Sequence, residues 1–156
     1  MFHTIVWATD GSEAADHALP YVKALARVDG ATVLVVHSRE MFVGRAHGYP
    51  VLADERELVE KIRGQVDALC EEGLDARFRL VSGNAPGAAR MIANVAREAG
   101  AELLVVGTRG FAPITGLLLG SVTQRLLHNA PCPVLAVPPP HEAAVEPERE
   151  RVATAS

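Results

Sequence analysis

The chain has 156 residues and a formal net charge of −4, with 49% hydrophobic and 22% charged residues. This length suits one domain, and this balance of residue types excludes wholesale disorder. A negatively charged chain without clustered Lys and Arg is a poor general binder of nucleic acid. Its two cysteines are too few for a disulfide scaffold. No apolar run approaches the roughly 20 residues that span a membrane, so we expect a cytoplasmic protein without membrane or nucleic-acid partners.

Short apolar runs alternate with amphipathic segments along the chain. Residues 5–9 are largely apolar and are followed by Asp10-Gly11-Ser12, which predicts a buried strand entering a turn. Ser12 is placed to cap a helix that we expect to reach about Val28, with a kink at Pro20. Further strands are predicted at 32–37, 76–81, 103–106 and 133–137, and further helices at 58–70, 86–99 and 121–129.

The predicted elements follow the order βαβαβαβαβ. Continuous apolar strands between amphipathic helices predict a parallel sheet that is covered by helices on both faces. The strand at 133–137 has prolines at both ends, which is typical of a sheet edge. On the polar face of the second predicted helix, Glu57 and Lys61 stand four residues apart, the spacing of an exposed ion pair.

Two segments lack this periodicity. Residues 38–50 collect glycines and a proline, and they predict a surface loop of a length often associated with ligands. Residues 139–156 have almost no large apolar side chain, which predicts a mobile, charged C-terminal tail. The folded domain is therefore expected over residues 1–138.

The most informative stretch contains four glycines, at 107, 110, 116 and 120, between a strand and a helix. Glycines let backbone amides approach an anion closely, and a helix N-terminus adds unpaired N–H donors. The hydroxyls of Ser121 and Thr123 would add two more donors, giving a phosphate site without a lysine. A P-loop or a dinucleotide fingerprint is excluded, because no Walker A lysine is present and no G-x-G-x-x-G follows the first strand. The alternative is that these glycines only shape a surface loop.

The motif Gly-x2-Gly-x9-Gly-Ser at 107–121 resembles the ATP-binding signature of the universal stress protein family. The opening run that leads into Asp10-Gly11-Ser12 and the closing Cys-Pro-Val at 132–134 are similar to other hallmarks of that family. The similarity covers residues 1–137, nearly all of the expected domain. It implies an open, mostly parallel five-stranded sheet, Rossmann-like or flavodoxin-like, in the order 3-2-1-4-5. The nucleotide would lie across the carboxyl ends of strands 1 and 4, where that order reverses.

The resemblance also implies roles for individual residues. Asp10 corresponds to the acidic residue that contacts the adenosine, and Val36 to the position whose backbone meets the adenine edge. Gly107 and Gly110 would pass close to the ribose and the phosphates. The residues that would hold the phosphate chain through amides and hydroxyls are Gly120, Ser121, Val122 and Thr123. Mg²⁺ often accompanies ATP in the family, since phosphate oxygens favour a hard cation.

Several of these residues have a simpler interpretation. The Asp10 carboxylate could instead cap the amides that follow it. Arg109 could neutralise ligand charge or be a solvated loop residue, and both interpretations remain open. His37 is expected to be a satisfied or exposed histidine rather than a ligand contact. The histidines show no i, i+4 pair and the serines no G-x-S-x-G elbow, so neither a transition-metal site nor a catalytic residue is expected.

These features together predict an ATP-binding stress-response protein that acts as a sensor or regulator through nucleotide occupancy. The resemblance implies a homodimer through the last strand, at Val134, Leu135, Ala136 and Val137. One alternative is a slow ATPase or a nucleotide-dependent phosphotransferase, although no group beyond Asp10 is evident to orient water. A second alternative is a dimerisation module of the same fold that binds no nucleotide. An FMN carrier fits less well, because its phosphate loop should follow the first strand.

Overall fold

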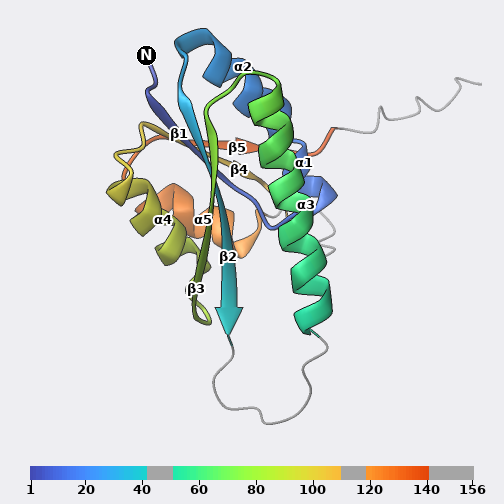
Figure 1. Ribbon diagram of the computed structural model, residues 1–156. Coiled ribbons are helices and arrows are strands. Elements are labelled where there is room, and N and C mark those ends of the chain that lie inside the picture. Colours follow the sequence, from blue (N-terminus) through green and yellow to red (C-terminus); the bar gives the residue numbers. More distant parts are fainter. Residues whose placement is uncertain (42–50, 110–118, 141–156) are drawn as a thin grey trace, which may run out of the picture.

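The computed structural model describes residues 1–41, 51–109 and 119–140, with side chains from residue 55 onward in the second range. Within these residues, five strands form one sheet in the order β3-β2-β1-β4-β5, and every neighbouring pair is parallel (Figure 1). The strands are β1 Thr4–Ala8, β2 Thr32–Met41, β3 Ala76–Asn84, β4 Leu103–Gly107 and β5 Val134–Val137. The predicted fold class, the strand order and the edge position of the last strand are therefore confirmed.

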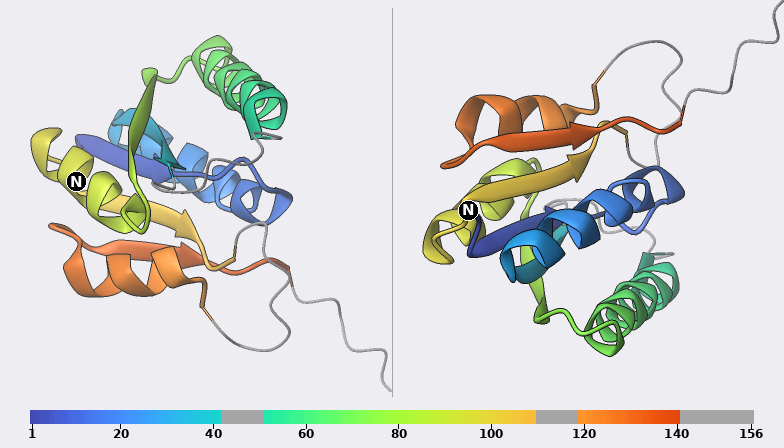
Figure 2. Two further views of the ribbon diagram at one scale, coloured as in Figure 1. Left: turned by 90° about the horizontal axis from the view of Figure 1, so that it is seen from below. Right: turned by 90° about the horizontal axis from the view of Figure 1, so that it is seen from above.

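Helices cover both faces of the sheet (Figure 2). They are α1 Glu13–Asp16, α2 Leu19–Asp29, α3 Val51–Glu71, α4 Ala88–Glu98 and α5 Ser121–Asn129. Side chains alternate along a strand, so Ile5 and Trp7 of β1 pack with α2 and α3, whereas Val6 and Ala8 pack with α4 and α5. Trp7 is fully buried, as expected of a core residue. None of the described helices is long and apolar enough to cross a bilayer.

The segment after β1 forms two helices, so the prediction of one helix with a kink at Pro20 is wrong. The Oγ of Ser12 accepts a hydrogen bond from the amide of Ala15 at 3.2 Å, as expected of a cap, but α1 already ends at Asp16. Pro20 lies in the first turn of α2, which begins at Leu19. A residue in the first turn needs no N–H for the helix ladder. Pro20 therefore begins a helix and does not bend one.

β2 and β3 are longer than the sequence pattern predicts. β1 pairs with β2 as far as Ala8↔Val36, but β2 continues beside β3 to Met41↔Asn84. The first four residues of the predicted surface loop, 38–41, are thus strand, because β3 supplies a ladder partner where periodicity is lost. The rest of that predicted loop, 42–50, and most of the predicted tail, 141–156, lie outside the described residues.

The turn between β1 and α1 is held by α3. Gly11 has a φ of +77°, and a Cβ on it would lie 2.2 Å from Cδ1 of Leu58. Lys61 donates from Nζ to the carbonyl of Gly11 at 2.6 Å and to Oδ2 of Asp16 at 2.7 Å. The sequence spacing predicts an ion pair of Lys61 with Glu57 on the helix surface. In the structure, the Lys61 ammonium group binds the turn instead. The backbone on either side of Asp10 is thereby fixed.

Substituting Gly11 with Ala tests this close contact. The left-handed backbone and the displaced Leu58 should together lower the free energy of unfolding by about 2–4 kcal/mol. Gly30→Ala is the matched control, because Gly30 also has a positive φ, +65°, and a Cβ added there would meet nothing within 4 Å. It should cost only about 1–2 kcal/mol. Urea denaturation of both variants measures the difference, and equal losses would contradict the role of Leu58.

Candidate functional site

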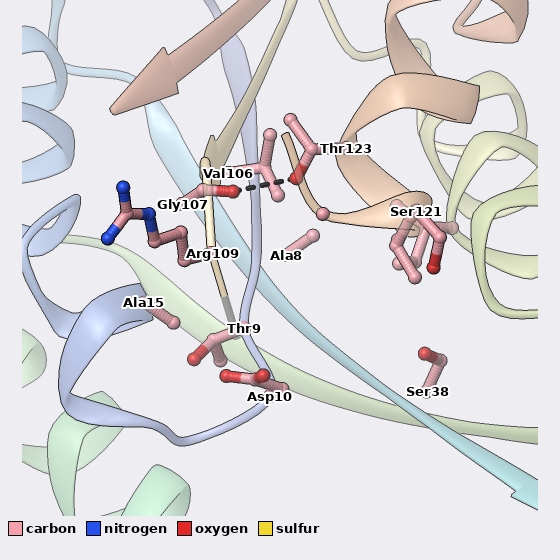
Figure 3. A pocket seen from close by; sticks show the side chains of 13 residues that line it. Ala8, Thr9, Asp10, Ala15, Ser38, Val106, Gly107, Arg109, Ser121 and Thr123 are labelled. Carbon is pink, nitrogen blue, oxygen red and sulfur yellow. Dashed lines mark hydrogen bonds between the residues drawn. The ribbon is translucent and has the colours of Figure 1, made fainter. Parts of the chain in front are cut away.

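A cavity of about 270 Å³ opens at the carboxyl ends of β1 and β4. Ligands of open α/β sheets bind at this point, where the strand order reverses. Figure 3 shows Asp10, Ser38 and Ser121 around the cavity, from β1's end, β2 and the start of α5. The predicted site residues that line it are Asp10, Gly107, Arg109, Gly120, Ser121, Val122 and Thr123. Gly110 lies outside the described residues.

Val36 is the predicted site residue that the structure does not place in the cavity lining. Its side chain is fully buried among residues of α4 and α5, and its carbonyl accepts the amide of Thr9 at 3.0 Å. Ser38, two residues further along β2 and on the same face, lines the cavity instead. Sequence reasoning missed Ser38 because the apolar pattern predicts that the strand ends at residue 37. Side chains two residues apart in a strand share a face, so extending the strand by one residue from 37 would have placed Ser38 on the face of Val36.

Asp10 combines both interpretations that the sequence left open. Its Oδ1 accepts the backbone N–H of Ser12 at 3.0 Å and the hydroxyl of Ser12 at 2.6 Å, so it does cap the amide that follows. The carboxylate also lines the cavity. An ionised carboxylate has about four lone-pair sites. It can therefore hold the turn and still accept a hydrogen bond from a ligand hydroxyl or amine.

The N-terminus of α5 lies on the side of the cavity that is opposite Asp10. Gly120 is the N-cap, without a side-chain cap, and its own amide donates to the carbonyl of Thr108 at 2.8 Å. The amides of residues 121–123 come next and have no acceptor within the helix. The helix dipole places partial positive charge at this end. Together with the exposed hydroxyl of Ser121, these donors form a cradle suited to an anion.

Thr123 has a different role from the one expected. It is buried, and its hydroxyl donates to the carbonyl of Gly107 at 2.7 Å. A hydroxyl has one proton, so this bond uses the donor that the sequence assigns to a phosphate. The bond joins the start of α5 to the end of β4. Arg109, just beyond β4, lines the cavity and brings a positive charge to it.

The remaining lining is largely apolar, from Ala8, Ala15, Ile92 and Val106. Apolar walls with a few oriented polar groups are typical of small-molecule sites. Ala15 and Ile92 lie on helices whose placement over the strand ends only the three-dimensional structure reveals, so no local sequence signal identifies them.

His37 is satisfied within the fold, as expected. It is buried, and its Nδ1 is 3.0 Å from the carbonyl oxygen of Thr9 while its Nε2 is 3.0 Å from Oε1 of Glu55. Cys132, the thiol near the last strand, packs against the α4 and α5 side of the core. Burial raises the pKa of the Cys132 thiol, which disfavours the reactive thiolate.

Comparisons with known proteins agree with this geometry. The model of the universal stress protein family matches residues 1–138. A universal stress protein of Thermus aquaticus is 37% identical over 140 residues, which cover 88% of this chain and 99% of that protein. The structure of the universal stress protein from Archaeoglobus fulgidus in complex with dAMP is 26% identical, with a TM-score of 0.64, and the match covers 88% of this chain and 98% of that one. A universal stress protein in complex with cAMP is 28% identical, with a TM-score of 0.57, over 87% of this chain and 96% of that one. The chain belongs to the universal stress protein family.

Proposed function

We propose that the cavity binds an adenine nucleotide, with ATP as the physiological ligand. The observation that carries this proposal is the pairing of opposite polarities across one cavity: the Asp10 carboxylate on one side and the uncapped N-terminus of α5 on the other. A nucleotide offers donors at its adenosine end and anionic phosphates at the other. The dAMP and cAMP complexes of relatives support an adenine ligand for this fold.

In the proposed arrangement, Asp10 accepts from the adenosine and the amides at 121–123 hold the phosphates, with Arg109 adding positive charge. The adenine edge, which the resemblance assigns to Val36, would meet the backbone of β2 near Ser38, because that residue reaches the cavity. Asp10 is the only carboxylate in the described lining. Mg²⁺, if carried, would therefore be bound chiefly by phosphate oxygens and water, as is usual for this ion.

The proposed role is that of a sensor or regulator in the stress response. Occupancy would change the surface around the cavity, and a ligand shifts such an equilibrium only by its differential affinity for two states. In the described lining, Asp10 is the only carboxylate and no histidine is present to act as a general base, and Oδ1 of Asp10 already accepts two bonds from Ser12. This favours binding over turnover.

Substituting Gly120 with Val tests the phosphate cradle. The φ of Gly120 is −58°, and an added Cβ would meet only the carbonyl oxygen of Thr108, at 3.4 Å, so the fold should tolerate the change. The valine methyl groups would occupy the phosphate path, and the affinity for MgATP should fall at least a hundredfold, about 2.7 kcal/mol.

Isothermal calorimetry with MgATP measures this loss, and circular dichroism checks the fold. Leu127→Val is the matched control on α5, since Leu127 is exposed and does not line the cavity. It should leave the affinity unchanged. Wild-type affinity in the Gly120→Val variant would remove the phosphate assignment.

We also propose a homodimer through the outer side of β5, over Val134, Leu135, Ala136 and Val137. β5 is the last strand of the described sheet. The carbonyl of Val137 accepts the amide of Thr108 at 2.9 Å, so this residue bonds toward β4. Backbone groups alternate in direction along a strand, which turns those of Val134 and Ala136 outward. An unpaired edge of this kind favours a symmetric partner.

Substituting Leu135 with Lys tests this interface. Leu135 is half-buried at the edge strand, and a charge there would have to be desolvated between two subunits. The variant should be monomeric by light scattering at concentrations where the wild type is dimeric. Leu127→Lys, on exposed Leu127 of α5, is the control and should remain dimeric. A dimeric Leu135→Lys protein, or a monomeric wild type, would show that the interface is elsewhere or absent.

A further inference from the structure

A second cavity lies on the other side of β2 from the nucleotide cavity. Its volume is about 430 Å³, and it lies between the N-terminal half of α3 and the strands β2 and β3. Its lining comes from Arg39 of β2, Leu80 of β3, and Glu55, Arg56, Val59, Glu60 and Arg63 of α3. We call it the arginine groove, after the three arginines in this set.

The arginines of this groove have no carboxylate partner among the described residues. The Nε of Arg39 is buried without a hydrogen-bond partner there. The guanidinium of Arg63 lies over the ring of Phe78 at 5.0 Å from its centroid, which leaves its N–H edges for another acceptor. Arg56 lies about two turns before Arg63 on the same side of α3. Elsewhere the pattern differs, for example at Arg79, which pairs with Glu98 at 2.6 Å.

A buried donor without an acceptor destabilises the folded state. The unpaired Nε therefore shows that the described residues leave the guanidinium of Arg39 incompletely satisfied, so that an additional acceptor at this group is favoured. Positive charge gathered in one place is also unexpected in a chain whose net charge is −4. Both features indicate an anion as the missing partner.

The two carboxylates of the groove do not cancel this charge equally. Glu55 is 14% exposed, and its Oε1 is engaged by Nε2 of His37 at 3.0 Å. Glu60 is exposed and is the carboxylate that would compete with an incoming anion for the arginines. Three guanidinium groups thus face one outward carboxylate, so an anion with more than one negative charge has the advantage.

We propose that the arginine groove binds a small phosphorylated molecule, at a site separate from the nucleotide cavity. Guanidinium groups present planar forks of donors that match phosphoryl oxygens. A volume of about 430 Å³ exceeds what one phosphate fills, and Val59 and Leu80 supply an apolar wall for an organic part. The side chains of Ser38 and Arg39 leave β2 on opposite faces, so the two cavities do not share their polar groups. The proposal does not depend on the identity of the nucleotide.

Titration of the full-length, ¹⁵N-labelled protein with pyrophosphate tests the groove, and the amide signals of Arg39 and Arg63 report on it. These signals should shift and saturate. Arg39→Gln and Arg63→Gln should each weaken binding about tenfold. Arg39→Lys keeps the charge but loses the fork, and it should weaken binding about threefold or more. Arg77→Gln is the control, because Arg77 is exposed and paired with Asp75 at 3.2 Å.

Pyrophosphate can also enter the nucleotide cavity, so the titration is repeated on the Gly120→Val variant. Groove signals that still shift there would support a separate site, whether or not that variant binds ATP. Shifts confined to Gly107 and Ser121 would overturn the proposal, as would the absence of saturation at about 10 mM pyrophosphate. Unchanged affinity in the Arg39→Lys variant would show that only positive charge matters at this position, and it would also overturn the proposal. So would binding of a phosphoserine peptide without binding of pyrophosphate, since the partner would then be a protein.

Discussion

The cavity at the carboxyl ends of β1 and β4 depends on these two strands ending side by side while the chain leaves them toward opposite faces of the sheet. After β1 the chain enters the helices that cover one face, and after β4 it reaches α5 on the other. This divergence opens a crevice in any parallel sheet whose strand order reverses. Hydrogen bonds fix both rims: Oγ1 of Thr9 accepts the amide of Gly11 at 3.0 Å, and the hydroxyl of Thr123 holds the carbonyl of Gly107. The crevice therefore has a defined shape before any ligand arrives.

The polarity of the crevice follows from how the helix N-termini are capped. Of α4 and α5, which cover the same face, α4 is capped by the protein itself: Oε1 of Glu40, from β2, accepts the amides of Gly87 and Ala88, the latter at 2.7 Å. α5 begins at Gly120, and no described side chain accepts the amides of residues 121–123. A carboxylate at the first terminus satisfies its donors and offsets its partial charge, whereas the second retains both. The proposed anion-binding end of the cavity is thus the N-terminus of α5, opposite Asp10.

The sequence predicted the sheet well, because four of the strands read as apolar runs, β3 reads as an alternation of apolar and charged residues, and helical spacing marks the segments between them. Two of its errors concern interactions between distant segments. The spacing of Lys61 and Glu57 predicted an ion pair on the helix surface. The hydrogen bond that Lys61 donates to Gly11 instead depends on how α3 crosses the end of β1. The sequence pattern suggested the hydroxyl of Thr123 as a donor to the ligand, but in the structure this hydroxyl donates its hydrogen bond to the carbonyl of Gly107. Local patterns carry no information about such partners.

Ser38 shows why the register of β2 matters beyond the core. Residues 37–41 of β2 continue past the end of β1, and successive side chains there point to opposite faces. Ser38 reaches the nucleotide cavity and Arg39 the arginine groove. A shift of one residue would exchange them, placing a cation in the first cavity and a hydroxyl among the arginines of the groove. The register is set upstream by Val35 and Val36, which are fully buried on opposite faces. Hydrophobic burial in the middle of the strand thus decides which chemistry each cavity receives.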